Sequence, residues 1–168
     1  ELNILELKCN IKNSNWFHLM YINQLKYYNE EDIKKNKSMV LSCDTCGGVN
    51  NKYFDVKLLK YFDFIFLTTD DLDKNMTIED IKENIKGYII LHEVDSYKII
   101  GNKKTGINIS IELDRSKILN NVNVLGAGDF FASSFIFYML DKEINNIDDI
   151  KKAINFCQDK VSESLKVN

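Results

Sequence analysis

Short apolar runs alternate with stretches of helical spacing along most of the 168-residue chain, and this alternation constrains the fold more than any other feature. Runs of four or five apolar residues bounded by polar residues are typical of buried strands, whereas apolar residues three or four apart favour helices. The first part of the chain predicts strands at 16–20, 39–43 and 64–67, and helical segments at 21–35, 55–61 and 77–86. This order is typical of an α/β domain with a doubly wound, mainly parallel sheet flanked by helices.

The pattern changes in the second part of the chain. Three strands lie close together and are separated by turn residues, which predicts a local antiparallel hairpin. These strands are expected at 88–91, 97–100 and 107–111, and two helices follow at 127–140 and 148–165. Because ligands bind at the carboxyl ends of strands in such sheets, the loops after Cys43, Leu67, Leu91 and Leu125 are the candidate positions for a site.

The composition narrows the class of protein. With 45% hydrophobic residues, the chain can bury a sizeable core as one domain. A net charge of −3 gives no electrostatic reason to expect binding to nucleic acid or to an anionic membrane. The apolar runs are far shorter than the roughly 20 residues that cross a bilayer, and no signal-peptide pattern is visible at the start. Four cysteines do not make a disulfide scaffold, so a reducing, cytoplasmic location is expected.

The most informative segment for function is Gly126–Ala127–Gly128–Asp129, which follows an apolar stretch and opens a predicted helix. Two glycines let backbone N–H groups turn toward one point, and a helix N-terminus adds unsatisfied donors and a partial positive charge. Such a loop can hold an anion such as a phosphoryl group. A carboxylate beside it, here Asp129, can accept a proton from an attacking hydroxyl. The simpler interpretation is a tight turn in which Asp129 only complements the helix dipole.

This segment resembles the second signature of the ribokinase-like (PfkB) carbohydrate kinases, which reads roughly D-T-x-G-A-G-D before a helix of small residues. Gly126 to Asp129 match it outright, and Ala132 and Ser133 match the small positions that follow. The strand that ends in Asp44 and the strand that leads into Thr68 resemble earlier strands of the same family. The resemblance therefore extends, more weakly, over most of the chain.

The resemblance implies an ATP-dependent phosphotransferase that moves the γ-phosphate to an alcohol group of a sugar, nucleoside or similar small molecule. It implies that Asp129 is the catalytic base and that Gly126, Ala127 and Gly128 form the anion hole for the phosphate. ATP and Mg²⁺ are the expected cofactors, and a small-molecule alcohol is the expected partner. The oligomeric state stays open, with a homodimer among the alternatives.

A second family motif, N-x-x-E, orders magnesium and phosphates through water, and here it reads Thr68–Thr69–Asp70–Asp71. The resemblance implies that Asp71, with Thr68, takes this role, and no direct metal ligand is predicted. Asp44 ends a predicted strand and is expected to face the crevice, toward phosphates or acceptor, or else to form a turn.

The chain also departs from the family. Asn123–Val124 replaces the Asp-Thr pair, no glycine occurs in 91–96, and larger residues occupy the small-residue run at 157–161. Family members run to about twice this length. The resemblance is to the C-terminal, ATP-side half, and the N-terminal lid and acceptor-binding part have no counterpart in these 168 residues. A non-catalytic nucleotide-binding or regulatory remnant of the fold is therefore a second hypothesis, and an unrelated α/β protein is a third.

Other chemically suggestive residues favour structural interpretations. Cys43 and Cys46 form a C-x-x-C, but zinc needs four ligands and no second pair exists. His18 lies within an apolar strand and is expected to be a satisfied core residue. With His92 as the second histidine and no nucleophile in a suitable context, the sequence does not favour a hydrolase triad.

Overall fold

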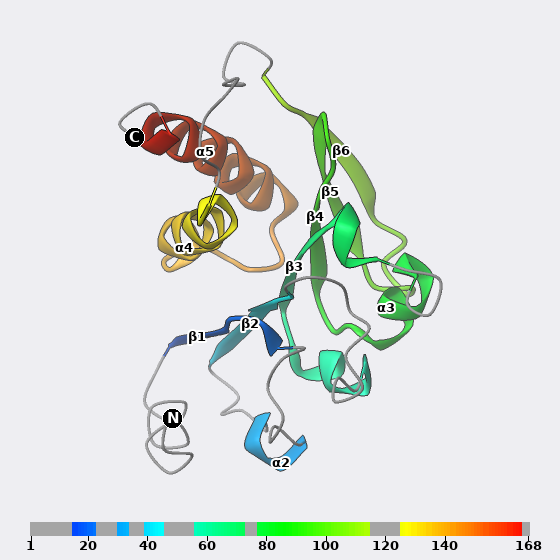
Figure 1. Ribbon diagram of the computed structural model, residues 1–168. Helices are drawn as coiled ribbons and strands as arrows, with labels where there is room; N and C mark the ends of the chain where they lie inside the picture. The colour runs from blue at the N-terminus through cyan, green and yellow to red at the C-terminus, as the bar shows by residue number, and fades with distance from the viewer. Residues whose placement is uncertain are drawn as a thin grey trace. The chain divides into compact units, whose positions relative to one another are not determined.

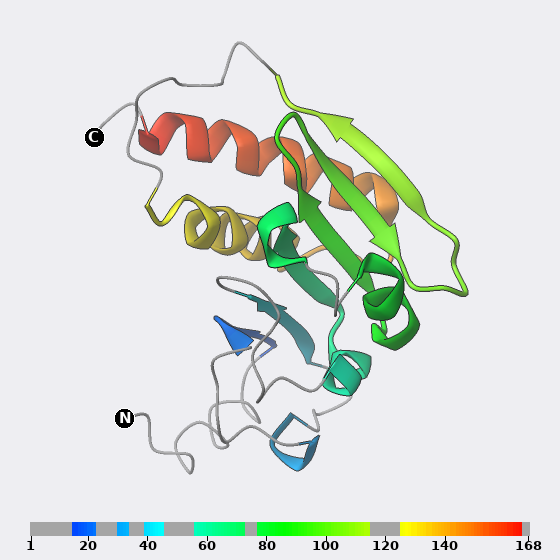
Figure 2. The ribbon, with the colours of Figure 1, turned by 45° about the vertical axis from the view of Figure 1, so that its right-hand side comes forward.

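The six strands of the protein form one sheet in which neighbours follow the order of the chain (Figure 1). The computed structural model describes residues 15–22, 30–33, 39–45, 56–72, 77–114 and 125–165. The strands are β1 (Trp16–Leu19), β2 (Val40–Asp44), β3 (Phe64–Thr68), β4 (Tyr88–His92), β5 (Ser96–Gly101) and β6 (Asn108–Glu112). β1 to β4 are parallel, whereas β4, β5 and β6 pair antiparallel (Figure 2). The predicted fold class, a mainly parallel sheet with a local antiparallel hairpin and flanking helices, is confirmed.

The chain divides into two compact units. The first comprises residues 1–93 and 98–109, and the second comprises residues 94–97 and 110–168. β1 to β4 lie wholly in the first unit, together with the short helices that connect them. The two long C-terminal helices lie in the second.

One face of the parallel strands carries the core of the first unit. Because side chains alternate along a strand, Leu41, Ile65 and Ile89 point to the same face of three neighbouring strands, and all three are buried. This face packs against α2 (Glu30–Ile33), η2 (Val56–Tyr61) and α3 (Ile78–Asn84). The segment predicted as a short helix at 55–61 is a 3₁₀-helix, and of the helix predicted at 21–35 the described residues contain one turn, α2.

The opposite face of the same strands carries aromatic side chains. The ring centroids of Trp16 and Phe64 lie 5.6 Å apart, and those of Phe64 and Tyr88 lie 6.0 Å apart, with both pairs stacked. Offset ring stacking contributes about 0.5–1.5 kcal/mol per pair beyond the area that is buried. Aromatic contacts therefore link β1, β3 and β4 on this face.

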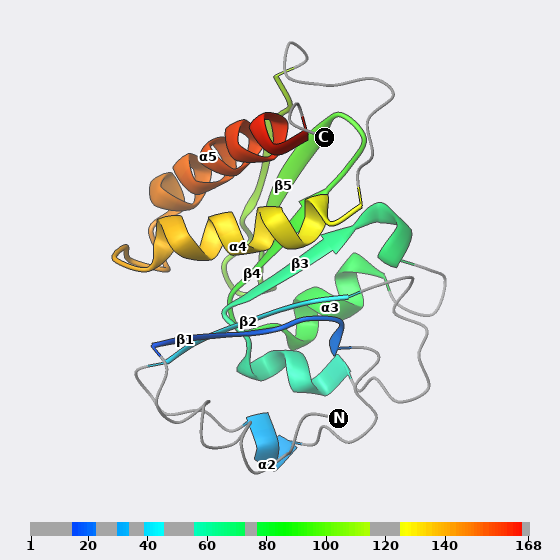
Figure 3. The same ribbon diagram turned by 60° about the vertical axis from the view of Figure 1, so that its left-hand side comes forward.

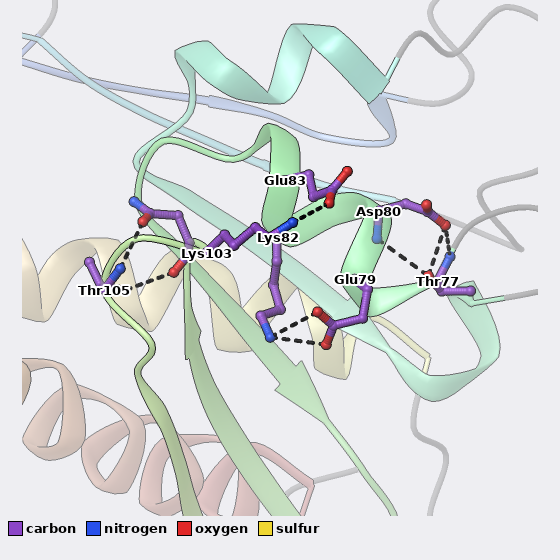
Figure 4. A network of polar contacts seen from close by, with 8 residues as sticks. Thr77, Glu79, Asp80, Lys82, Glu83, Lys103 and Thr105 are labelled. Carbon is purple, nitrogen blue, oxygen red and sulfur yellow. Dashed lines mark hydrogen bonds and ion pairs between the residues drawn. The ribbon is translucent and has the colours of Figure 1, made fainter.

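The turn between β5 and β6 is tied to α3 by polar contacts within the first unit (Figure 4). Lys103 Nζ contacts Glu83 Oε1 at 2.7 Å, and the backbone N–H of Lys103 donates to the carbonyl of Lys82 at 3.2 Å. Lys82 in turn pairs with Glu79 on the surface of α3. Exposed ion pairs of this kind contribute little stability, so these contacts chiefly orient the turn.

The second unit contains α4 (Ala127–Met139) and α5 (Ile147–Leu165), which pack against each other (Figure 3). The ring of Phe131 in α4 stacks on Tyr97, with centroids 4.6 Å apart. Both helices occur within a residue of their predicted limits. Among the described residues, no helix is long and apolar enough to cross a membrane.

Candidate functional site

The glycine loop forms the start of α4, as predicted. Gly126 is the N-cap residue and adopts φ 80° and ψ 0°, in the left-handed region where residues other than glycine are strained. The backbone N–H of Phe130 donates to the carbonyl of Gly126 at 2.9 Å, which closes the first helical turn. The N–H groups of Ala127 and Gly128 precede this bond and therefore have no acceptor within the helix.

The space beside the two loop glycines is open. A Cβ atom built on Gly126 or Gly128 would meet no other segment of the described residues within 4 Å, whereas one on Gly87 would lie 2.0 Å from the carbonyl oxygen of Asp63. Packing thus explains the glycine at 87, and backbone conformation explains the glycine at 126. Neither explains Gly128, which is exposed among the described residues at the start of α4.

Asp129 is the third residue of α4 and is half-buried in its first turn. The positive end of the helix dipole lies at this turn, where negative charge is favoured. The position suits both roles considered for Asp129, a proton acceptor beside a bound phosphate and a simple partner of the dipole. A measurement of turnover distinguishes them, as set out below.

Thr68 and Asp71 are brought together in the first unit, at the carboxyl end of β3. Asp71 is the last residue of η3 (Thr69–Asp71) and is 4% exposed. Its Oδ2 accepts the backbone N–H of Thr68 at 2.7 Å and the hydroxyl of Thr68 at 3.0 Å. Among the described residues, Oδ1 of Asp71 meets no hydrogen-bond donor. One oxygen of Asp71 therefore closes a turn.

Asp44 lies at the carboxyl end of β2, where it was predicted, and both of its oxygens contact the end of β1. Oδ2 lies 3.2 Å from Nε2 of His18, and Oδ1 accepts the backbone N–H of Tyr21. The side chain of Asp44 is 11% exposed. Asp44 therefore takes part in an ordered polar cluster rather than only forming a turn.

Two further residues belong to this cluster and were not predicted. Nδ1 of His18 lies 2.8 Å from Oγ of Ser42, and the indole N–H of Trp16 donates to the same oxygen at 2.9 Å. The parallel register pairs His18 with Ser42, which places both on one face. Alternation along the two predicted strands could have placed Trp16, His18, Ser42 and Asp44 on that face, but the register between the strands was needed to bring them into contact.

The cluster contains a serine, a histidine and an aspartate, yet its geometry does not suit nucleophilic catalysis. Ser42 is fully buried in the sheet. Its oxygen accepts the hydrogen bond from Trp16, so no substrate carbonyl can reach it. His18 is a satisfied residue of the sheet face, which agrees with the structural interpretation of the sequence.

The cysteines offer no reactive thiol in the part of the chain that the structure describes. Burial raises the pKa of Cys43 well above its ordinary value, with a smaller contribution from the charge of Asp44. Burial likewise raises the pKa of Cys157. Cys46, the second cysteine of the C-x-x-C, lies outside the described residues. No three metal-ligating side chains gather within the described ranges.

Comparison with known proteins gives a match in structure but not in sequence. No protein-family model matches the chain, and no curated protein matches it. A pyrophosphate-dependent kinase in the ribokinase family, solved as a sulfate complex, superposes with a TM-score of 0.64 at 18% identity over 94% of this chain and 59% of its own. Aminoimidazole riboside kinase from Salmonella enterica gives a TM-score of 0.68 at 12% identity, over 89% of this chain and 56% of its own.

A third neighbour comes from an insect. Adenosine kinase from Anopheles gambiae, solved with P1,P4-di(adenosine-5) tetraphosphate, gives a TM-score of 0.69 at 16% identity, over 94% of this chain and 52% of its own. The chain thus spans between half and three-fifths of the length of these structures, while nearly all of the chain is matched. Such likeness, at low identity, is a likeness of fold. The protein has the ribokinase-like fold.

Proposed function

We propose that this chain is the donor-side half of a phosphotransferase that moves the terminal phosphoryl group of ATP to an alcohol group of a sugar, nucleoside or similar small molecule. The observation that carries the proposal is the start of α4. There, two glycines border open space among the described residues, and the N–H groups of Ala127 and Gly128 lack a helical acceptor. An anion bound at this place would accept hydrogen bonds from the N–H groups that have no acceptor in the helix. The ribokinase-like fold supports the phosphoryl group as that anion.

Asp129 is the catalytic base in this proposal. Phosphoryl transfer needs a group that orients the attacking hydroxyl and accepts its proton, and the rest of the catalysis is positioning and charge stabilisation. Asp129 stands one residue after Gly128, so its carboxylate lies beside the place where the transferred group would be held. The backbone N–H groups of Ala127 and Gly128 would stabilise the negative charge that develops on the transferred group.

Magnesium fits the described residues only in a particular way. No cluster of three potential ligands exists among them, so they supply no all-protein cage. Mg²⁺ commonly keeps several waters and binds through substrate phosphates with one or two carboxylates. Asp71, with Oδ1 unengaged among the described residues, could hold a water of the ion, and Thr68 fixes the Asp71 side chain. When bound, the ion would neutralise phosphate charge.

A non-catalytic binding module is the second candidate function, and one observation favours it. Asp71 stands at the position of the family's N-x-x-E glutamate and is one methylene shorter. Its Oδ2 accepts hydrogen bonds from Thr68. If this loss abolishes magnesium handling, the glycine loop would still bind phosphate without turnover. Turnover measured beside binding separates the two functions.

Gly128→Ala tests the loop because a phosphate-binding site and a simple tight turn at a helix start predict different effects of this substitution. Alanine fits the open space and is the better helix former, so the free energy of unfolding should rise by up to about 1 kcal/mol. The added methyl group would occupy the space assigned to phosphate, so calorimetry should show binding of ATP weakened by about tenfold or more, equivalent to about 1.4 kcal/mol.

Ser133→Ala is the matched control, because Ser133 is exposed on the same helix one turn further on. It should leave ATP binding unchanged. The unmodified chain should bind ATP more tightly than AMP, which lacks the terminal phosphates. Equal binding of ATP and AMP, or full ATP binding by Gly128→Ala, would remove the loop as a phosphate site.

A further inference from the structure

His18 connects β1 with β2 through both nitrogens of its ring. Nδ1 lies 2.8 Å from Ser42 Oγ, and Nε2 lies 3.2 Å from Asp44 Oδ2. Ser42 and Asp44 are two residues apart on one strand, so their side chains share a face. The imidazole therefore bridges the buried middle of β2 and its carboxyl end.

The carboxylate of Asp44, which only accepts, determines that Nε2 of His18 carries a hydrogen. An indole N–H can only donate, so Ser42 Oγ accepts from Trp16 at 2.9 Å and its own hydrogen can point to Nδ1 of His18. An Nδ1 that accepts leaves the hydrogen of the neutral ring on Nε2, from which it is donated to Asp44. An ionised carboxylate only accepts, so this arrangement satisfies all four groups. When the ring of His18 is neutral, it is therefore the Nε2–H tautomer.

The other oxygen of Asp44 is held by a strained residue. Tyr21 has φ 53°, in the left-handed region, and its backbone N–H donates to Asp44 Oδ1. This conformation is sterically unfavourable for a residue other than glycine. Strain of this kind persists only where surrounding contacts impose it, and it clusters at functional sites. Two independent groups at the end of β1 thus restrain one carboxylate.

We propose that His18 is a positioning residue for Asp44. Trp16 and Ser42 complete the hydrogen bonds on the Nδ1 side of the ring, and Nε2 of His18 together with the N–H of Tyr21 orients the carboxylate. Its remaining lone pairs then accept an O–H donor at the carboxyl end of β2. This donor rests on the proposed function: it is a hydroxyl of the acceptor other than the attacking one, or a water on Mg²⁺, and the kinetic test below distinguishes them.

The first test reads the tautomer directly and needs no activity. The chain has two histidines, so ¹⁵N side-chain spectra of the whole protein at neutral pH are assigned with one variant, His92→Gln. We expect a pyridine-type Nδ1 and a pyrrole-type Nε2 for His18. A ring protonated on Nδ1 alone would overturn the proposal.

The second test uses two amide variants that differ in reach. In His18→Gln, the side-chain amide N–H can lie near the position of Nε2 and donate to Asp44. In His18→Asn, the side chain is shorter, and its amide reaches only the position of Nδ1. We expect His18→Gln to retain the wild-type KM values within about threefold. His18→Asn should raise one of them by about tenfold, as loss of an orienting partner typically does.

The parameter that changes identifies the donor. A rise in the KM of the acceptor alcohol assigns Asp44 to the non-attacking hydroxyl of the acceptor, and a rise in the magnesium requirement assigns it to a metal-bound water. A merely structural His18 would lower the unfolding midpoint of both variants alike and leave both constants unchanged, which would overturn the proposal. Absence of phosphoryl transfer in the unmodified protein would instead overturn the proposed function, and with it the donor assigned to Asp44.

Discussion

The starts of α3 and α4 carry an aspartate at the same helical position, and they differ in what caps them. In α3, the side chain of Thr77 accepts the N–H of Asp80, and the carboxylate of Asp80 accepts the N–H and hydroxyl of Thr77 at 2.9 and 2.8 Å. Figure 4 shows this closed arrangement. In α4 the N-cap residue is Gly126, which has no side chain to accept from the helix.

A side-chain N-cap satisfies one of the donors of a helix start, as Thr77 does for the N–H of Asp80. A start with a glycine N-cap and open space beside it leaves that role to something else. The turn at Thr68 and Asp71 stands between these cases: it repeats the hydrogen bonds of Thr77 and Asp80 in a buried setting. Aspartates at one helical position can therefore serve different functions, and substitutions at each should separate them.

The largest effect is expected for Asp129→Asn. As general base, Asp129 should contribute about 10²–10⁴-fold to kcat, and its loss should leave the KM for ATP nearly unchanged. The interaction of the carboxylate with the helix dipole contributes at most about 1 kcal/mol to the free energy of unfolding, and asparagine keeps the shape and the acceptor oxygen of the side chain. Steady-state kinetics and a denaturant titration on one preparation measure both quantities.

Asp80→Asn is the matched control for this prediction, because Asp80 occupies the same position in α3. It should leave turnover at the wild-type level. If Asp129→Asn also retained near-wild-type turnover, Asp129 would be a dipole partner like any other, and most of the case for a kinase would be lost.

An intermediate effect is expected for Asp71→Asn. The amide can still accept from Thr68 through its oxygen, so the fold should be kept. If Oδ1 of Asp71 holds a water of the magnesium ion, the concentration of Mg²⁺ needed for half-maximal activity should rise by about tenfold, typical of an outer-sphere ligand. A magnesium titration of activity checks this, with Asp80→Asn as the variant that should not respond. An unchanged magnesium requirement would make Asp71 a capping residue only.

The smallest effect is expected for Thr77→Ala, which removes the N-cap of α3. Its loss should cost about 1 kcal/mol in the free energy of unfolding and should not alter activity. The backbone N–H of Thr77 and, to a smaller extent, its hydroxyl hold the pKa of the Asp80 carboxyl below its ordinary value, and Thr77→Ala removes the contribution of the hydroxyl. The cap is therefore complete above that ordinary value and is lost as pH falls through the lowered pKa. Urea titrations at neutral and acidic pH should show the difference between wild type and variant shrinking toward acidic pH.

Several elements could be predicted from the sequence because their signals are local. The four-residue apolar run at Phe64–Leu67 marks β3, and the Thr-x-x-Asp pattern at Thr77 marks the start of α3; both occur as predicted. The helix expected at 55–61 forms a 3₁₀-helix instead, since a short segment takes its conformation from the surface on which Leu58 and Leu59 are buried.

The candidate site shows the same division. The glycine loop could be recognised because two glycines and a following helix are adjacent in the chain. The partners of Asp44 could not, because His18 lies on a different strand. Nor could the sequence show that Oδ2 of Asp71 accepts hydrogen bonds from Thr68. The residue types at 68–71 resemble a metal-ordering motif and a capping turn equally well.

The sequence by itself determined the elements, their alternation and the place of the glycine loop at a helix start, because periodicity, capping and glycine chemistry act over a few residues. Only the tertiary structure decided which polar atoms are satisfied. The strand register puts His18 beside Ser42 and leaves Asp44 restrained from both sides. The space beside Gly128 is likewise a property of the folded chain. Hydrogen bonding and free volume depend on distances between segments far apart in sequence, and those distances exist only once the chain is packed.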